Sequence, residues 1–469
     1  MNSDLCTPGD VPGVFFSVYV SGAVSMAKKA ASSAAAKKSP ITQSSGMSGI
    51  VEGMRQKTGS TRIQDGDNSV VIGIPVPSLV IRYMLQSNIL PLGKIWHLTG
   101  EEGSCKSAFL YEMMRWHYMC NGGVALAQNE NKDSAELRRS IMQYNPLWQQ
   151  RFIKQDTATM EEWMDFVSSA MAGTVAEYER KGSSGATWPM LIGVDSLTAT
   201  APESEIESIE SAGHSTRGFA LMANLISRYM RFMPGTVMDN PFTVVGTNHL
   251  KPGTDLRGLP KDAVPGGMSV KFMETYEFKL KRIADIEKAK YSGITIEFTA
   301  KKNSLGQSRR KVKADMIWWR GTAPDGTVRQ ETAWDWDTAA IELLLSYENA
   351  KGKRGLYKEL QEVCDIKVVN RKQKKAYSSE LGVLKEEPVG YRALGAKLEQ
   401  RPDVLEKLYP LLGISQRPVW DMTVPFLTAL KKEFAIVEAA TAKAVKDMMS
   451  GAVPFIPPTF PDMEGGDDE

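Results

Sequence analysis

A lysine and a serine that follow a short glycine-containing stretch are the residues whose types and spacing suggest chemistry most directly. Residues 100–107 read GEEGSCKS, which fits the phosphate-binding pattern G-x-x-x-x-G-K-[ST] except that Cys105 stands where the second glycine is expected. In this pattern the loop N–H groups and the lysine contact phosphates, and the hydroxyl ligates Mg²⁺. The sequence therefore predicts a nucleoside triphosphate site made by Gly100, Glu101, Glu102, Gly103, Ser104, Cys105, Lys106 and Ser107.

The flanking residues predict the strand and the helix that must hold this loop. A short apolar run ends at Gly100, and a helix-forming stretch covers residues 107–118. The N-terminus of such a helix favours bound phosphate, because its free N–H groups and its dipole point at the ligand. A turn that binds nothing has a similar composition, so the wider context has to decide between the two interpretations.

Three further apolar stretches end in polar side chains. Asp195 follows one of them and is predicted to hold Mg²⁺ opposite Ser107, although an aspartate also commonly caps such a turn. Glu130 follows the second and is predicted to activate a water molecule. Asn248 and His249 end the third and are predicted to sense a γ-phosphate. Together with the loop, these strand ends indicate an ATP or GTP site.

The alternation of expected helices and strands predicts the fold class. Expected strands lie at 69–74, 123–128, 151–155, 189–195, 242–248, 270–282, 293–300 and 311–319, and expected helices at 77–85, 107–118, 134–142, 159–173 and 216–233. Short apolar strands that alternate with helices are typical of a mostly parallel sheet that is covered on both faces. We therefore expect an α/β fold. Later helices are expected at 338–348, 391–399, 403–412 and 423–449.

The composition restricts the class of protein. The 469 residues include 57 Lys and Arg against 55 Asp and Glu, so nucleic-acid binding would have to come from local basic patches. Four scattered cysteines without a C-x-x-C pair argue against a disulfide framework or a zinc site and fit a reducing, cytoplasmic setting. The apolar residues 14–20 follow no basic segment, so neither a signal peptide nor a membrane span is expected.

These motifs together resemble the RecA family, and in particular the phage UvsX-type recombinases. The resemblance covers about 75–313 and rests on the order and spacing of Pro77-Ser78-Leu79, the run 90–95, the loop 100–107, Glu130, Val194-Asp195-Ser196, Asn248-His249, Gly266-Gly267 and Lys302-Asn303. It implies a RecA-like P-loop NTPase core with a mostly parallel twisted sheet. In that core Lys106, Ser107 and Asp195 hold ATP and Mg²⁺, and Glu130 activates the hydrolytic water.

The resemblance also implies where nucleic acid and a neighbouring subunit bind. Residues 202–215 correspond to a first DNA-binding loop and residues 250–267 to a second. The second is rich in glycine and proline, and long loops of this kind are usually functional. Lys301 and Lys302 fall near the lysines that RecA-like filaments present to the ATP of the neighbour, with Ser304 in the place of one of them.

The expected DNA contacts combine basic side chains with glycines that allow close approach. They are Lys251, Arg257, Lys261, Gly266 and Gly267 in the second loop and Arg217 at the start of a helix. An ordinary surface loop is the alternative for the first five, and a solvated helix face is the alternative for Arg217.

The sequence and the resemblance divide the chain into five expected parts. They are a disordered basic N-terminal arm (1–48), an N-terminal polymerisation segment (49–74), a RecA-like ATPase core with DNA-binding loops (75–320), a smaller, mainly helical C-terminal domain (321–450) and a disordered acidic tail (451–469).

The expected function is that of an ATP-dependent DNA recombinase. It would form a helical filament on single-stranded DNA and promote homologous pairing and strand exchange with double-stranded DNA, in the host cytoplasm if the chain is of phage origin. Single-strand-binding and mediator proteins are further expected partners, and no membrane is expected. Two alternatives stay open: a ring-forming DNA helicase with the same core fold, and a DNA-coating mediator whose loop, altered at Cys105, binds nucleotide without hydrolysis.

Overall fold

The computed structural model describes residues 71, 73–120, 122–130, 134–142, 151–181, 189–212, 218–237, 240, 242–254, 260–263, 268–304, 306–322, 328–347 and 358–417. The expected N-terminal arm, most of the polymerisation segment, the helix at 423–449 and the acidic tail lie outside these residues. Among the helices within the described ranges, none combines the length and the apolar character needed to cross a lipid bilayer.

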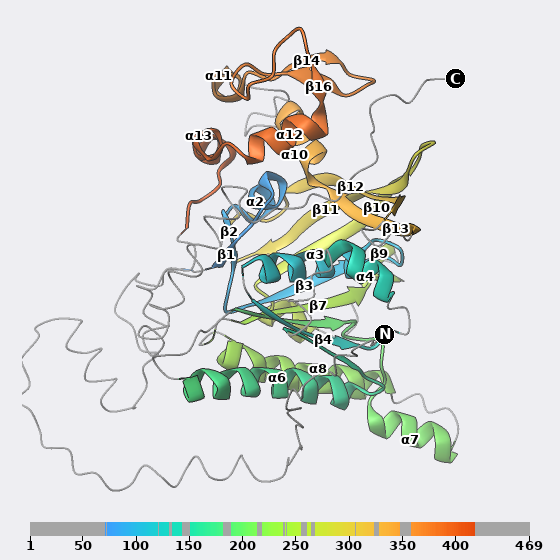
Figure 1. Cartoon of the computed structure of the whole chain (residues 1–469). Helices are drawn as coiled ribbons and strands as arrows, with labels where there is room; N and C mark the ends of the chain where they lie inside the picture. Colours follow the sequence, from blue (N-terminus) through green and yellow to red (C-terminus); the bar gives the residue numbers. More distant parts are fainter. Residues whose placement is uncertain are drawn as a thin grey trace, which may run out of the picture. The chain divides into compact units, whose positions relative to one another are not determined.

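A nine-stranded mixed sheet forms the centre of the described chain (Figure 1). Its strands follow the order β13-β12-β11-β10-β3-β7-β6-β4-β5, parallel from β10 to β5 and antiparallel from β10 to β13. The strands are β3 (Lys94–Gly100), β4 (Gly123–Gln128), β5 (Phe152–Asp156), β6 (Met190–Asp195), β7 (Phe242–His249), β10 (Tyr276–Glu287), β11 (Ser292–Asn303), β12 (Lys311–Thr322) and β13 (Val328–Asp335). This mixed sheet with its flanking helices agrees with the expected α/β class.

Helices cover both faces of the parallel strands. One face carries α3 (Lys106–Met119) and α4 (Ala135–Met142), and the other carries α6 (Met160–Lys181) and α8 (Gly218–Val237) (Figure 1). Successive side chains of a strand point to opposite faces. Accordingly Ile95 belongs to the apolar cluster under α6 and α8, whereas Trp96 and Leu98 belong to the cluster under α3.

Shorter elements connect these layers. They are β1 (Gly73–Pro75), α2 (Leu79–Leu85), β2 (Ile89–Pro91), α7 (Glu203–Ala212), β8 (Lys251–Thr254), β9 (Pro260–Ala263) and α9 (Met268–Met273). The strand expected at 270–282 is instead α9 followed by β10, because Val270 and Met273, three residues apart, both pack on the cluster under α8. A spacing of three is helical, and the period of two begins only at Tyr276.

The sheet continues past residue 320, where the sequence suggested that the core ends. Strand β13 pairs with β12 and leads into α10, and the remaining elements are α10 (Trp336–Ser346), α11 (Lys358–Cys364), β14 (Lys367–Asn370), β15 (Lys375–Tyr377), β16 (Val389–Gly390), α12 (Tyr391–Glu399) and α13 (Pro402–Leu412). Glu399 accepts hydrogen bonds from Leu79 N (2.6 Å) and Arg82 Nη1 (3.0 Å), and therefore attaches α12 to the first turn of α2.

Candidate functional site

The parallel registers bring the polar strand ends to one edge of the sheet. Gly100 is paired with His249, and Gln128 is paired with Asp195, so β3, β7, β4 and β6 end side by side. Glu130 follows β4 by two residues, and its backbone N–H lies 3.3 Å from the carbonyl oxygen of Asp195. Residues that are far apart in the sequence are therefore assembled around the loop between β3 and α3.

The loop between β3 and α3 folds around its own lysine. Lys106 Nζ donates to the carbonyl oxygens of Gly100 (3.2 Å) and Glu101 (2.8 Å), and lies 3.5 Å from Ser104 Oγ. Burial lowers the pKa of Lys106, while the nearby carboxylates of Glu130 and Asp195 act in the opposite direction. The Lys106 ammonium is thus held within the loop by neutral carbonyl oxygens. A negatively charged acceptor, such as a phosphate oxygen, can replace them.

Cys105 occupies a backbone conformation that usually selects glycine. Its φ is 62°, in the left-handed region, where a side chain costs roughly 1–2 kcal/mol. This explains why the phosphate-binding pattern has glycine at this position. Burial raises the pKa of the Cys105 thiol to about 12, so it stays uncharged at neutral pH and places no negative charge beside the lysine.

His249 links the loop lysine to Glu130. Its Nδ1 lies 3.3 Å from Lys106 Nζ, and its Nε2 lies 2.7 Å from Glu130 Oε1. An ammonium group can only donate, so Nδ1 is the acceptor, and the proton on Nε2 is donated to the carboxylate. The contact partners therefore select the tautomer of a histidine whose side chain is 31% exposed.

Asp195 and Ser107 face each other across the same site. Asp195 is buried and accepts hydrogen bonds from the hydroxyls of Thr247, at 2.5 Å, and Ser107. Burial raises the pKa of this carboxyl, and the two hydrogen bonds oppose the shift. Thr247 was not singled out from the sequence, although it lies on the same face of β7 as His249, two residues away.

A cavity of about 330 Å³ lies over the loop and the strand ends. It is lined by residues 102–107, Glu130, Asp195 and His249, and by six residues that the sequence motifs do not include: Ala108, Tyr111, Gln128, Ser134, Leu137 and Met316. Tyr111 follows Ser107 by one helical turn and was therefore recognisable from helix spacing. Met316 comes from β12, and no local pattern connects it with the loop.

The donor set of the cavity suits a magnesium ion. Mg²⁺ is usually bound by one or two protein oxygens together with substrate phosphates, rather than by a complete protein cage. Ser107 and Asp195 supply two such oxygens, in hydrogen-bond contact with each other. Within the described ranges no group of three or more His, Cys, Asp and Glu side chains has the arrangement of a complete metal site.

Five of the predicted nucleotide contacts do not line this cavity: Gly100, Glu101, Asn248, Lys301 and Lys302. Asn248 is buried and accepts a hydrogen bond from Thr198 Oγ1 at 2.6 Å. Lys301 and Lys302 lie on β11, and Lys302 Nζ donates to the carbonyl oxygen of Lys271 at 2.6 Å. A role for the two lysines at the site of a neighbouring subunit stays a prediction.

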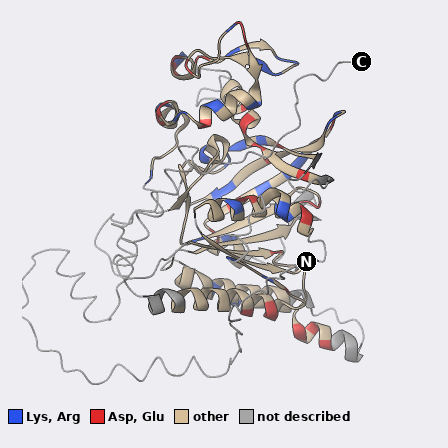
Figure 2. Ribbon diagram, in the orientation of Figure 1, with Lys and Arg blue, Asp and Glu red and all other residues tan. Residues whose placement is uncertain are grey.

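The expected DNA contacts are only partly within the described chain. Lys251 and Lys261 lie on the antiparallel pair β8–β9, so the second expected loop contains a short hairpin. Arg217, Arg257, Gly266 and Gly267 lie outside the described residues. The first expected loop is helical over α7, along which Figure 2 shows acidic residues in red. Negative charge repels phosphates, and a DNA-binding role for 202–215 stays a prediction.

The sequence is similar to RecA proteins over its central region. It is 23% identical to RecA of Petrotoga mobilis over 264 residues, which are 56% of this chain and 66% of that protein. RecA of Acholeplasma laidlawii is 21% identical over 268 residues, 57% of this chain and 75% of the relative. RecA of Thermosynechococcus vestitus is 23% identical over 244 residues, 51% and 62% of the two chains.

These matches leave parts of both proteins uncovered. The chain spans about two thirds of the length of the Petrotoga protein. No family model matches the sequence. The weak similarity nevertheless supports a distant relationship between this chain and the RecA family.

Proposed function

We propose that this chain is a DNA-dependent ATPase of the RecA type that acts as a recombinase. The observation that carries the proposal is the convergence of Lys106, Ser107, Glu130, Asp195 and His249 on one cavity, although they come from separate segments of the chain. The similarity to RecA proteins supports the same interpretation independently. A phage UvsX-type recombinase in the cytoplasm of a host is the more specific form of this proposal.

The residues of the cavity suggest how ATP is held and hydrolysed. Lys106 would exchange its carbonyl contacts for phosphate oxygens, and Ser107 and Asp195 would hold Mg²⁺. When bound, Mg²⁺ neutralises charge on the phosphates. Glu130 accepts a proton from the attacking water. Its hydrogen bond to His249 Nε2 fixes the direction of the carboxylate, which orients that water.

The position of His249 suggests how hydrolysis is coupled to DNA binding. His249 ends β7, and the chain continues directly into β8 and the segment expected to contact DNA. A γ-phosphate that engages Lys106 takes away a partner of His249 and so favours a different position of the chain from β8 onward. ATP between neighbouring subunits, with Lys301 and Lys302 supplied by the neighbour, would stabilise a filament on single-stranded DNA, and hydrolysis would remove that contact.

Substitution of the loop lysine tests the proposal. Lys106→Ala is expected to abolish ATP hydrolysis, measured as phosphate release with and without single-stranded DNA, because the substitution removes the positive charge that the loop encloses. Lys311→Ala is the matched control, since Lys311 is 60% exposed on β12 and pairs with Glu297. Hydrolysis that survives Lys106→Ala would reject this cavity as the site.

The form of the assembly on DNA distinguishes a recombinase from a helicase of similar fold. Electron microscopy with single-stranded DNA and a non-hydrolysable ATP analogue is expected to show open helical filaments. Closed rings would contradict the recombinase proposal.

A further inference from the structure

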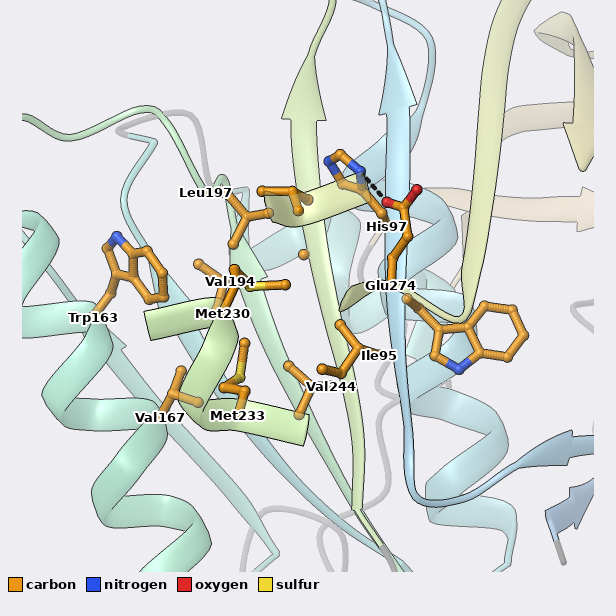
Figure 3. A pocket seen from close by; sticks show the side chains of 13 residues that line it. Ile95, His97, Trp163, Val167, Val194, Leu197, Met230, Met233, Val244 and Glu274 are labelled. Carbon is orange, nitrogen blue, oxygen red and sulfur yellow. Dashed lines mark hydrogen bonds and ion pairs between the residues drawn. The ribbon is translucent and has the colours of Figure 1, made fainter. Parts of the chain in front are cut away.

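A second histidine–glutamate pair lies inside the protein, away from the cavity. His97 Nδ1 and Glu274 Oε2 are 2.8 Å apart, and each side chain is only 1% exposed. Figure 3 shows the pair at one side of a group of apolar side chains, with Leu197 and Ile95 nearest and Trp163 on the far side. These residues line a cavity of about 10 Å³, too small for a substrate.

The pair joins two elements at a specific junction. His97 lies on β3, three residues before Gly100, where the loop begins. Glu274 directly follows α9, and the next residue, Thr275, donates its N–H to the carbonyl oxygen of Ile95 at 2.8 Å. The chain that leaves α9 is therefore attached to β3 at this point, immediately before β10 starts.

The chain between His249 and Glu274 is also attached to the nucleotide loop at its first residue. It begins after His249, which contacts Lys106 and Glu130, and it ends at Glu274. Residues 250–273, which include the DNA contacts expected in the second loop, thus lie between two histidine–glutamate pairs along the chain. One pair touches the loop and the other touches the strand that leads into the loop.

The buried pair is not explained by stability alone. Burial raises the pKa of Glu274, so the charged form is costly at this position. Within the described chain, His97 Nε2 and Glu274 Oε1 have no hydrogen-bond partner, so the pair is only half satisfied. A buried ion pair is often no more stabilising than apolar side chains of similar size, and a role in selecting one arrangement is the better-attested use.

We propose that His97 and Glu274 are positioning residues that transmit the state of the nucleotide loop to the end of segment 250–273. This inference rests on the proposed function. A ligand that moves the loop moves the end of β3, and the tight pair carries that displacement to α9. Nucleotide would then control affinity for single-stranded DNA from both ends of the segment, rather than through His249 alone.

Glutamine substitutions test this link, because they keep a polar side chain of similar size but replace the imidazole or the carboxyl that forms the contact. Wild type, His97→Gln, Glu274→Gln and the double variant are titrated with a fluorescent ATP analogue. They are then titrated with a labelled single-stranded oligonucleotide, with and without a non-hydrolysable ATP analogue. We expect nucleotide affinity to stay within about twofold, while the nucleotide-dependent gain in DNA affinity, about tenfold in wild type, falls toward one. The double variant should lose no more of this nucleotide-dependent gain in DNA affinity than either single variant does.

Glu112→Gln is the matched control. Glu112 is equally buried and accepts hydrogen bonds from Trp116 Nε1 (3.0 Å) and Trp336 Nε1 (3.2 Å), far from segment 250–273 along the chain. The control should keep the tenfold gain. A retained gain in either variant, or loss of cooperative melting in both, overturns the inference, because the pair would then be a structural contact only. Wild type that shows no nucleotide binding rejects the proposed function instead.

Discussion

Two histidine–glutamate pairs of almost equal length differ in what surrounds them. His249 and Glu130 are 2.7 Å apart, with side chains 31% and 15% exposed at the edge of the cavity. His97 and Glu274 are 2.8 Å apart and sealed in the interior. The open pair can exchange a proton or a partner with a ligand, whereas the sealed pair can act only through its position. The two pairs have the same residue types, so it is exposure to a ligand that allows one pair to take part in a reaction and limits the other to positioning.

The largest expected effect concerns the open pair. Glu130→Gln should lower ATP hydrolysis at least a hundredfold, because general-base catalysis typically contributes a factor of about 10²–10⁴. Nucleotide affinity should change little, since Lys106, Ser107 and Asp195 are untouched. Phosphate release and titration with a fluorescent nucleotide measure the two effects. If Glu274→Gln lowered basal hydrolysis as strongly, the distinction between the pairs would fail.

Truncation of each histidine compares the pairs by their contribution to stability. His97→Ala leaves the Glu274 carboxyl buried without its partner and should lower the free energy of unfolding by about 3–5 kcal/mol. His249→Ala should cost less than about 1 kcal/mol, because its pair is partly exposed to water. Urea unfolding measures both values. Equal losses would mean that exposure does not separate the two sites.

Asp337, a partly buried carboxyl, extends the comparison to pH. Burial, with the nearby carboxylates of Asp335 and Glu399, raises its pKa from 3.8 to about 8. The folded state keeps a proton that the unfolded chain releases near pH 4. The free energy of unfolding therefore falls between about pH 4 and pH 8, by at most about 1.4 kcal/mol per pH unit.

Asp337→Asn should remove this contribution. Its Tm is expected to fall less than that of wild type between pH 6 and pH 8, with calorimetry as the measurement. An identical pH dependence in both proteins would show that burial does not shift this carboxyl as described.

The smallest expected effect is that of Cys105→Gly. Glycine adopts a φ of 62° without steric strain, so this change should raise the free energy of unfolding by about 0.5–1 kcal/mol and preserve hydrolysis. Chemical denaturation and phosphate release measure the outcome. Lost hydrolysis in this variant would assign the thiol a function beyond its backbone position.

The sequence predicted most of what lies on the parallel strands. The loop, Glu130, Asp195 and His249 each stand directly beside an apolar strand, and parallel pairing brings such ends together. The α/β class and the covering helices could be expected from the alternation of short apolar runs with helical stretches, whereas the antiparallel pairing from β10 to β13 was not predicted. The structure places these side chains together, while their roles in binding and hydrolysis stay predictions.

The features that the sequence did not predict depend on contacts between distant segments, which leave no pattern in the local sequence. Met316 reaches the cavity from a strand that lies far along the chain, and Glu274 finds His97 only after α9 ends. The strand expected at 270–282 was interrupted because tertiary packing of Val270 and Met273 selected a helical turn. Helical residues in α7 likewise replaced part of an expected loop.

The hydrogen bonds from α2 to Glu399 have a practical consequence for experiments. A shortened chain that stops before α12 would leave Leu79 N and the Arg82 guanidinium without the carboxylate that they contact here. Damage to folding would then be mistaken for an effect on catalysis. Point substitutions that keep α12 are consequently better tools for testing the proposed nucleotide chemistry than shortened fragments.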